Sequence, residues 1–374
     1  LRGLAVSTDR QSLYVAHQIL NDYPATTRGG VHWGGVLVNV IRDVKIARLH
    51  AVPPSTSPAG DLVYLGHPDR AAGDPAGLIV SNDGRQILAF AGVSEIAISD
   101  READYFRRVA VGRRPAALML GTKGRTIYVA NMMDDSVSIV PIDASSDVRS
   151  IQLGPPRELS LVEQGEQLFY DATLSSDGWL SCHSCHTDGH TNGRLNDNFG
   201  DGSVGAPKRV LSLLGVGATG PWSWSGKVVR LEEQVRKSIR TTMRGEEPTH
   251  AQVAALAAYL RTLSPPPSLS SARQQQPGET VARGARVFRQ QGCADCHQPN
   301  RFTSPEIYDV GLQDRFGNRR FNPPSLLGVS QRSALFHDGR AASVRDVLMG
   351  HRHGIAQDVS QTEIEELIDY LNSL

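Results

Sequence analysis

The sequence lacks the features that would tie the chain to a membrane or to a polyanion. It has no apolar run approaching the roughly 18 residues of a membrane-spanning helix, and therefore predicts no transmembrane segment. Its 39 basic residues equal its 39 acidic ones and are scattered, so no nucleic-acid partner is expected. The chain begins with Leu1 and has no charged and then apolar leader, which leads us to expect a processed or truncated start whose export signal is gone.

Cysteine is scarce, and its distribution is informative. All four cysteines fall in two pentapeptides, Cys182-His183-Ser184-Cys185-His186 and Cys293-Ala294-Asp295-Cys296-His297, so none is left for a disulfide. Cys-x-x-Cys-His is the attachment signature of a c-type haem: two thioethers hold the porphyrin and the histidine is the proximal iron ligand. A zinc site built from the four cysteines is the alternative, but it leaves both histidines unexplained. The motifs predict two haems c with His186 and His297 as proximal ligands, and hence a periplasmic protein.

Residues 1–154 are predicted to form β structure. Three segments, residues 4–16, 78–90 and 118–130, share an apolar strand, a polar turn and a second strand rich in β-branched and aromatic residues. The last two begin about 40 residues apart, which is the blade period of a β-propeller, and the third resembles a YVTN-type repeat. Because a closed propeller needs about four to eight blades, we expect blades to be missing upstream. A small open β-sheet domain packed on the haem part is the alternative.

An internal repeat organises the rest of the chain. Each copy has a helix with Gly and then Phe four residues later, a haem pentapeptide, the string Ser-Leu-Leu-Gly-Val and a closing amphipathic helix with a Tyr-Leu pair. The linker between the copies is rich in Pro, Ser and Gln. The predicted fold is multidomain β plus α: incomplete propeller repeats in residues 1–154, then tandem all-α cytochrome c-like domains in residues 155–266 and 267–374.

These residues resemble the bacterial di-haem cytochrome c peroxidase superfamily, which includes the di-haem enzymes that mature methylamine dehydrogenase. The resemblance covers residues 155–374 and rests on both haem pentapeptides, on Trp224-Ser225-Gly226-Lys227 and on Phe336-His337-Asp338-Gly339-Arg340. It implies that peroxide or oxygen reacts at the first haem, and that the second haem receives electrons from a small redox protein. It also implies that Trp224, between the haems, relays the electrons.

The sixth ligand of the second haem is expected in one loop. An ungapped count from Phe336 places His351 at the family's axial Met position, with Met349 and His353 two residues to either side. We expect His351 to be the ligand and keep the other two as alternatives. The ungapped count also pairs His351 with Ser238 of the first copy, which binds haem iron poorly.

The distal side of the first haem departs from the family pattern. Gln234 matches the family's distal Gln, but Arg244 stands where the family has its distal Glu. Glu246 or Glu247 could move the proton, and Arg244 could stabilise the leaving oxygen. In the competing interpretation, Met243 is a sixth ligand that closes the site.

A calcium ion between the haem domains, as the peroxidases have, has little support in the sequence. The Asn of the family's Arg-Asn-x-Pro string is absent from the matching residues 208–211. The leading hypothesis is a periplasmic di-haem oxidoreductase that uses electrons from the second haem to reduce peroxide or oxidise a substrate at the first. The alternative is an electron carrier with two six-coordinate haems that docks a partner protein through the β domain.

Overall fold

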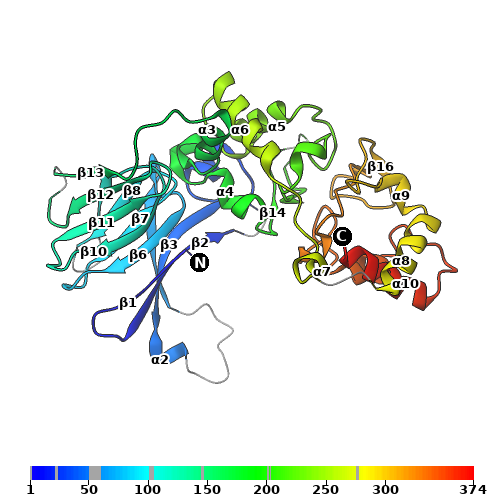
Figure 1. Cartoon of the computed structure of the whole chain (residues 1–374), viewed down its shortest axis with the longest axis horizontal. Helices are drawn as coiled ribbons and strands as arrows, with labels where there is room; N and C mark the ends of the chain where they lie inside the picture. The colour runs from blue at the N-terminus through cyan, green and yellow to red at the C-terminus, as the bar shows by residue number, and fades with distance from the viewer. Residues whose placement is uncertain are drawn as a thin grey trace.

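The computed structural model describes residues 2–21, 24–49, 60–100, 105–144, 147–199, 202, 204–274 and 278–374. Three antiparallel sheets lie at one side of the molecule, and the helices form two groups beyond them (Figure 1). The first helical group packs beside the sheets, and the second lies at the far end. No helix in the described ranges is long and apolar enough to cross a bilayer.

The first sheet is a five-stranded antiparallel meander. Its strands are β1 (Gly3–Val6), β2 (Ser12–Leu20), β3 (Leu37–Lys45), β4 (Asp61–His67) and β5 (Arg70–Ala71), with the short helices α1 (Arg28–His32) and α2 (Ile46–Leu49) on either side of β3. Thr27 caps α1, because its side chain accepts a hydrogen bond from the Gly30 amide.

The second and third sheets are four-stranded meanders. Their strands are β6 (Pro75–Val80), β7 (Gln86–Phe90), β8 (Glu95–Ser99) and β9 (Phe106–Ala110), and then β10 (Pro115–Leu120), β11 (Thr126–Asn131), β12 (Ser136–Pro141) and β13 (Arg149–Gln152). The three repeated segments supply the first two strands of the three sheets, as predicted. Strand β6 contacts both β1 and β10, so the sheets stand side by side. That they are blades of a propeller stays a prediction.

The first helical group follows the sheets. It comprises α3 (Leu161–Phe169), η1 (Ala172–Leu174), η2 (Ser176–Gly178), α4 (Cys182–Cys185), η3 (Thr187–Gly189), β14 (Leu195–Asn196), β15 (Lys208–Arg209), η4 (Val216–Ala218), α5 (Leu231–Lys237), the π-helix η5 (Ser238–Thr242) and α6 (His250–Thr262). Helix α3 packs across α6. The crossing is close, because a Cβ on Gly165 would meet the Ala255 carbonyl oxygen at 1.9 Å.

The second helical group repeats this plan. It comprises α7 (Leu269–Ala272), α8 (Glu279–Gln290), α9 (Cys293–Cys296), β16 (Tyr308–Asp309), β17 (Arg320–Phe321), η6 (Val329–Gln331), the π-helix η7 (Asp346–Gly350) and α10 (Gln361–Asn372). Helix α8 packs across α10, and a Cβ on Gly284 would meet the Glu366 carbonyl oxygen at 1.9 Å. The repeated glycines therefore serve the same purpose in both copies, which is to let two helices touch.

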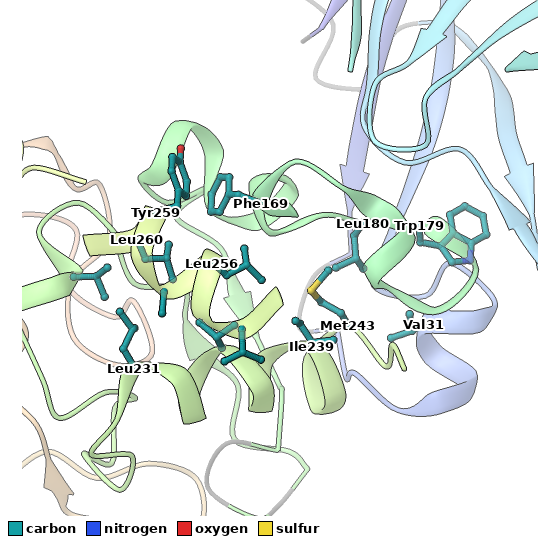
Figure 2. Close-up of a cluster of buried hydrophobic side chains, with 14 of the residues drawn as sticks. Val31, Phe169, Trp179, Leu180, Leu231, Ile239, Met243, Leu256, Tyr259 and Leu260 are labelled. Carbon is teal, nitrogen blue, oxygen red and sulfur yellow. The ribbon is translucent and has the colours of Figure 1, made fainter. Parts of the chain in front are cut away.

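The sheets and the first helical group share one buried core. Val31 and Leu37 from the β region pack in the same cluster as Phe169, Trp179 and Met243 of the helical group (Figure 2). The second helical group has its own core, built around α8 and α10. The β region is therefore part of the scaffold that positions the first attachment motif.

Candidate functional site

The first haem pentapeptide forms the one-turn helix α4. Its cysteines stand three residues apart and therefore lie on the same side of the turn. The Ser184 hydroxyl and the Ser181 amide are joined by a 2.9 Å hydrogen bond that closes the start of the turn. Burial raises the pKa of the Cys182 and Cys185 thiols to about 12. Free thiolates are therefore disfavoured here, whereas uncharged thioethers would suit the same surroundings.

A carboxylate from the β region accepts hydrogen bonds from the start and the middle of this helix. Asp74, between β5 and β6, is buried and accepts a 2.7 Å hydrogen bond from the Ser184 hydroxyl. It also accepts hydrogen bonds from the Ser181 hydroxyl and from the Gln18 amide, the latter at 3.2 Å. The β region thus holds the start of the attachment helix through two hydrogen bonds to one buried carboxylate, which Gln18 of β2 helps to fix in place.

A cavity of about 270 Å³ opens beside α4. Its lining includes Cys182, Cys185 and His186, and it combines leucine, valine, isoleucine and tryptophan side chains with polar and charged ones, although most of the exposed lining surface is apolar. Burial lowers the pKa of His186 to about 4, so its imidazole is neutral, as a metal ligand must be. Two sulfurs, a neutral imidazole and an apolar cavity fit a c-type haem. Cys182 and Cys185 would hold the porphyrin, and His186 would hold its iron.

Two of the residues predicted for catalysis line this cavity. Trp224 and Gln234 both belong to its wall. The Gln234 amide nitrogen donates to the Ser238 hydroxyl at 3.1 Å, while its buried carbonyl oxygen has no partner. A buried, unsatisfied acceptor facing a cavity is suited to bind a small donor such as a peroxide O–H.

The surroundings of Arg244, Glu246 and Met243, which were also predicted for this site, differ from those of Trp224 and Gln234. Arg244 donates through Nε to the Thr26 carbonyl oxygen at 2.5 Å and lies over the Phe199 ring, so its guanidinium is engaged with neighbouring loops. Glu246 is exposed and lies outside the cavity lining. This geometry does not support the predicted roles of Arg244 and Glu246. Met243 lines the cavity and also packs next to Leu180 in the buried cluster (Figure 2).

The second pentapeptide forms the equivalent one-turn helix, α9. It follows Gly292, whose positive φ of 70° makes the turn into it. The His297 Nδ1 lies 3.0 Å from the Phe302 carbonyl oxygen, an arrangement that leaves Nε2 for a metal. Burial lowers the pKa of His297 to about 4. Helix α9 has no buried residue, whereas three residues of α4 are buried. The second attachment site is therefore the more accessible one.

Of the three candidate sixth ligands, the structure favours His353. Met349 is 39 % exposed, and its sulfur lies near the Arg345 guanidinium. His351 is also exposed, with Nε2 at 4.0 Å from an Asp346 carboxylate oxygen. The Nδ1 of His353, in contrast, is buried without a partner, and a charge on His353 lowers the pKa of His297. His353 is therefore the candidate whose ring has a buried nitrogen without a partner.

The π-helices give a structural alignment of the two distal sides. In the first copy, the backbone amides of Met243 and Gly245 donate hydrogen bonds to the first and second carbonyl groups of η5. In the second copy, the backbone amides of His351 and His353 donate in the same way to the first and second carbonyl groups of η7. Gly245 thus stands where the second copy has His353, and the sequence-based pairing of Ser238 with His351 is wrong. A Cβ on Gly245 would meet the Leu174 carbonyl oxygen at 1.8 Å, so no side chain fits there.

The two helical groups meet through corresponding residues of the repeat. The Asn322 amide donates to the Trp224 carbonyl at 2.9 Å, and the Arg209 amide donates to the His337 carbonyl at 2.6 Å. The rings of Trp224 and His337 meet edge-on, with centroids 6.3 Å apart, and His337 stacks on Phe321 at 4.4 Å. Trp224 therefore lies at the junction, with a ring of the second copy against it.

An ion pair occupies the junction near the stretch where the family's calcium ligand was sought. The Lys208 ammonium lies 3.1 Å from the Asp314 carboxylate, with one partner in each helical group. A fixed ammonium beside this carboxylate disfavours a calcium ion at the same place.

Sequence reasoning missed three residues that the structure brings to the first site. Asp74 precedes the attachment motif by more than 100 residues and resembles any turn aspartate. Arg209 and Arg332 also line the cavity. Only Arg209 had a sequence signal, since it stands within the stretch compared with the family's Asn motif.

Comparison with known proteins gives a consistent family. The sequence profile of the family described as di-haem cytochrome c peroxidase matches residues 160–264 and 287–373. The methylamine utilization protein MauG of Methylorubrum extorquens is 27 % identical over 57 % of this chain and 77 % of its own length. The cytochrome c551 peroxidase of Nitrosomonas europaea is 23 % identical over 62 % of this chain and 84 % of its own length.

A solved structure shares the fold. The structure of Kuenenia stuttgartiensis hydrazine synthase pressurized with xenon aligns over 59 % of this chain and 89 % of the matched chain, with a TM-score of 0.52 and 23 % identity. The profile match covers both haem pentapeptides and both closing helices, and the family is one of di-haem enzymes. The chain belongs to the di-haem cytochrome c peroxidase family.

Proposed function

We propose that this protein is a periplasmic di-haem oxidoreductase that receives electrons at its second haem and uses them to reduce peroxide at its first. A haem iron with an open sixth position can bind a small molecule, whereas one with two strong axial ligands transfers electrons. Reduction of one hydrogen peroxide takes two electrons and two protons and yields two waters.

The observation that carries this proposal is the difference between the two distal sides. His353 has a buried, unpartnered ring nitrogen at the second site, while Gly245 leaves the corresponding place in the first site without a side chain. Gln234 adds an unsatisfied acceptor to the wall of the first cavity. These differences support an open distal side at the first haem and two histidine ligands at the second.

The chain's own residues suggest a direction of electron flow. The second attachment helix is the more accessible, which suits the approach of a small redox protein. Trp224 lies between the copies, contacts His337 of the second and lines the first cavity. Its indole N–H donates to the Arg209 carbonyl at 2.8 Å, which fixes the ring's orientation. These contacts support a relay through Trp224. A partner for the β region stays a prediction.

The spin states of the two irons in the oxidised protein test the assignment. We expect one high-spin and one low-spin haem in the electron resonance spectrum, and peroxide-dependent oxidation of a reduced small cytochrome. Gln234→Ala should lower the turnover with peroxide, whereas Gln164→Ala, at an exposed helix position, should not. Trp224→Phe should slow reduction of the first haem, with Trp33→Phe, at a 73 % exposed position, as its control.

The alternative function as an electron carrier depends on the position of Met243. Met243 lines the first cavity, and its sulfur as a sixth iron ligand would close the site. Two low-spin haems, with the first becoming high-spin in Met243→Leu, would establish the carrier and refute the peroxidase proposal. Packing of Met243 against Leu180 and Ile239 favours the peroxidase.

A further inference from the structure

Two buried arginines from different helical groups face the first cavity. Arg209 lies in β15 and is 3 % exposed. Arg332 ends the turn η6 in the second helical group, yet it lines the cavity that contains Cys182 and His186. The second copy of the repeat therefore contributes a cation to the site of the first.

Neither guanidinium is neutralised. Arg209 donates through Nε to the Phe336 carbonyl oxygen at 3.3 Å. Arg332 donates to the carbonyl oxygens of Ser325 and Leu327, both at 2.8 Å, and its buried Nε has no partner. Within the ranges that the structure describes, no carboxylate pairs with either group, and all of these acceptors are neutral.

Burial also works against both charges. Burial lowers the pKa of both arginines to about 10, and the charge of Arg332 contributes to the decrease at Arg209. Both remain charged at neutral pH. Two like charges buried near each other cost several kcal/mol when no anion accompanies them, and proteins therefore rarely retain such a pair without a ligand.

We propose that Arg209 and Arg332 bind the propionate carboxylates of the haem tethered at Cys182 and Cys185. A c-type haem carries two carboxylates, and guanidinium groups bind carboxylates through paired, charge-assisted hydrogen bonds. The porphyrin would bring this charge into the cavity already fixed in place by its thioethers. The inference rests on the haem of the proposed function, but not on its reaction with peroxide.

This arrangement links the two helical groups through the first haem. Arg332 would join a cofactor attached to the first copy to the backbone of the second. A cation beside the propionates also stabilises the reduced, more negative haem, and therefore raises its potential. Removal of one cation should shift the potential of the first haem to more negative values and leave that of the second haem unchanged.

Arg332→Gln is the cleaner test, because the Arg209 guanidinium also lies over the Trp224 ring, 5.6 Å from its centroid. Arg332→Lys keeps the charge, and Arg286→Gln removes an exposed arginine from α8 of the same helical group. Redox titration of the purified di-haem protein should show a negative shift of the first haem in Arg332→Gln, a smaller shift in Arg332→Lys and none in Arg286→Gln. The propionate bending bands in the resonance Raman spectrum should move only in the Arg332 variants.

The same experiments separate the other outcomes. If the first haem is attached but its potential and propionate bands are identical in Arg332→Gln and the native protein, the inference is overturned. If the native protein's potential responds to added inorganic phosphate, a soluble anion occupies the site instead. If intact mass shows no haem on Cys182 and Cys185, the proposed function fails first, and Arg332 is not the cause.

Discussion

The identity of the sixth ligand of the second haem can be tested directly, because two candidate histidines only two residues apart differ in their surroundings. His353 has a buried, unpartnered Nδ1, whereas His351 is exposed with a carboxylate 4.0 Å away. We predict that His353→Gly converts the second haem from low spin to high spin, and that His351→Ala leaves it low spin. The two substitutions remove the same kind of ring from the same loop.

The two histidine rings make similar packing contacts. Both rings meet Phe336 edge-on, with centroids at 5.4 Å for His353 and 5.3 Å for His351. An aromatic contact of this kind is worth about 0.5–1.5 kcal/mol. The Asp346 carboxylate oxygen, 4.0 Å from Nε2 of the exposed His351, adds little. Loss of these ring contacts therefore does not separate the variants, so a spectral difference between them can be attributed to the iron ligand.

Absorption and electron resonance spectra of the oxidised protein measure the result. In His353→Gly, the low-spin signal of the second haem should disappear, and added imidazole should restore it by entering the space left by the side chain. A low-spin His353→Gly protein together with a high-spin His351→Ala protein would refute the argument from burial. If both variants stay low-spin, Met349→Leu tests the remaining candidate.

Three further predictions concern the scaffold. Asp74→Ala should lower the free energy of unfolding by about 1–3 kcal/mol, because two buried serine hydroxyls lose their acceptor; Asp74→Asn, which keeps one acceptor, should lose less in the same denaturant titration. Gly245→Ala should reduce thermal stability through collision with a backbone carbonyl, whereas Gly29→Ala meets nothing within 4 Å and should not. Glu163 accepts hydrogen bonds from the Ser160 side chain and backbone, which lower its pKa from 4.5 to about 2. Its stabilisation is therefore complete above pH 4.5 and lost as the pH falls toward 2, so the stability difference between native protein and Glu163→Gln should narrow over that range; a constant difference would contradict this.

The repeat pattern predicted most of the architecture. The same short strings recur in both copies because the same local contacts recur, as with the glycines of α3 and α8, each of which touches a crossing helix. The paired strands of the β region were visible for a similar reason: each turn connects neighbours in sequence. The local sequence pattern was therefore enough to predict the secondary-structure elements and their order along the chain.

The distal sites were harder to predict, for two physical reasons. Counting residues without gaps assumes that the segments before the distal residues have the same length in both copies. The hydrogen bonds of the two π-helices show that they do not, because Gly245, and not Ser238, aligns with the loop that contains His351 and His353. Residues such as Asp74 and Arg332 act on the first site across long stretches of chain, and nothing in their immediate sequence marks them. Their roles depend on how the three parts of the molecule pack together.

The buried carboxylate beneath the first attachment helix also has a consequence for biogenesis. In the folded protein, Cys185 is enclosed, and Asp74 holds the serines on both sides of Cys182. Both cysteines line the cavity, so the same packing sets where the vinyl groups of an incoming porphyrin would have to lie. The β strands precede the haem motif in the chain and are completed first during synthesis. The sheets can therefore carry the acceptor for Ser181 and Ser184 before these serines are synthesised, and the attachment helix would fold onto a β region that is already formed.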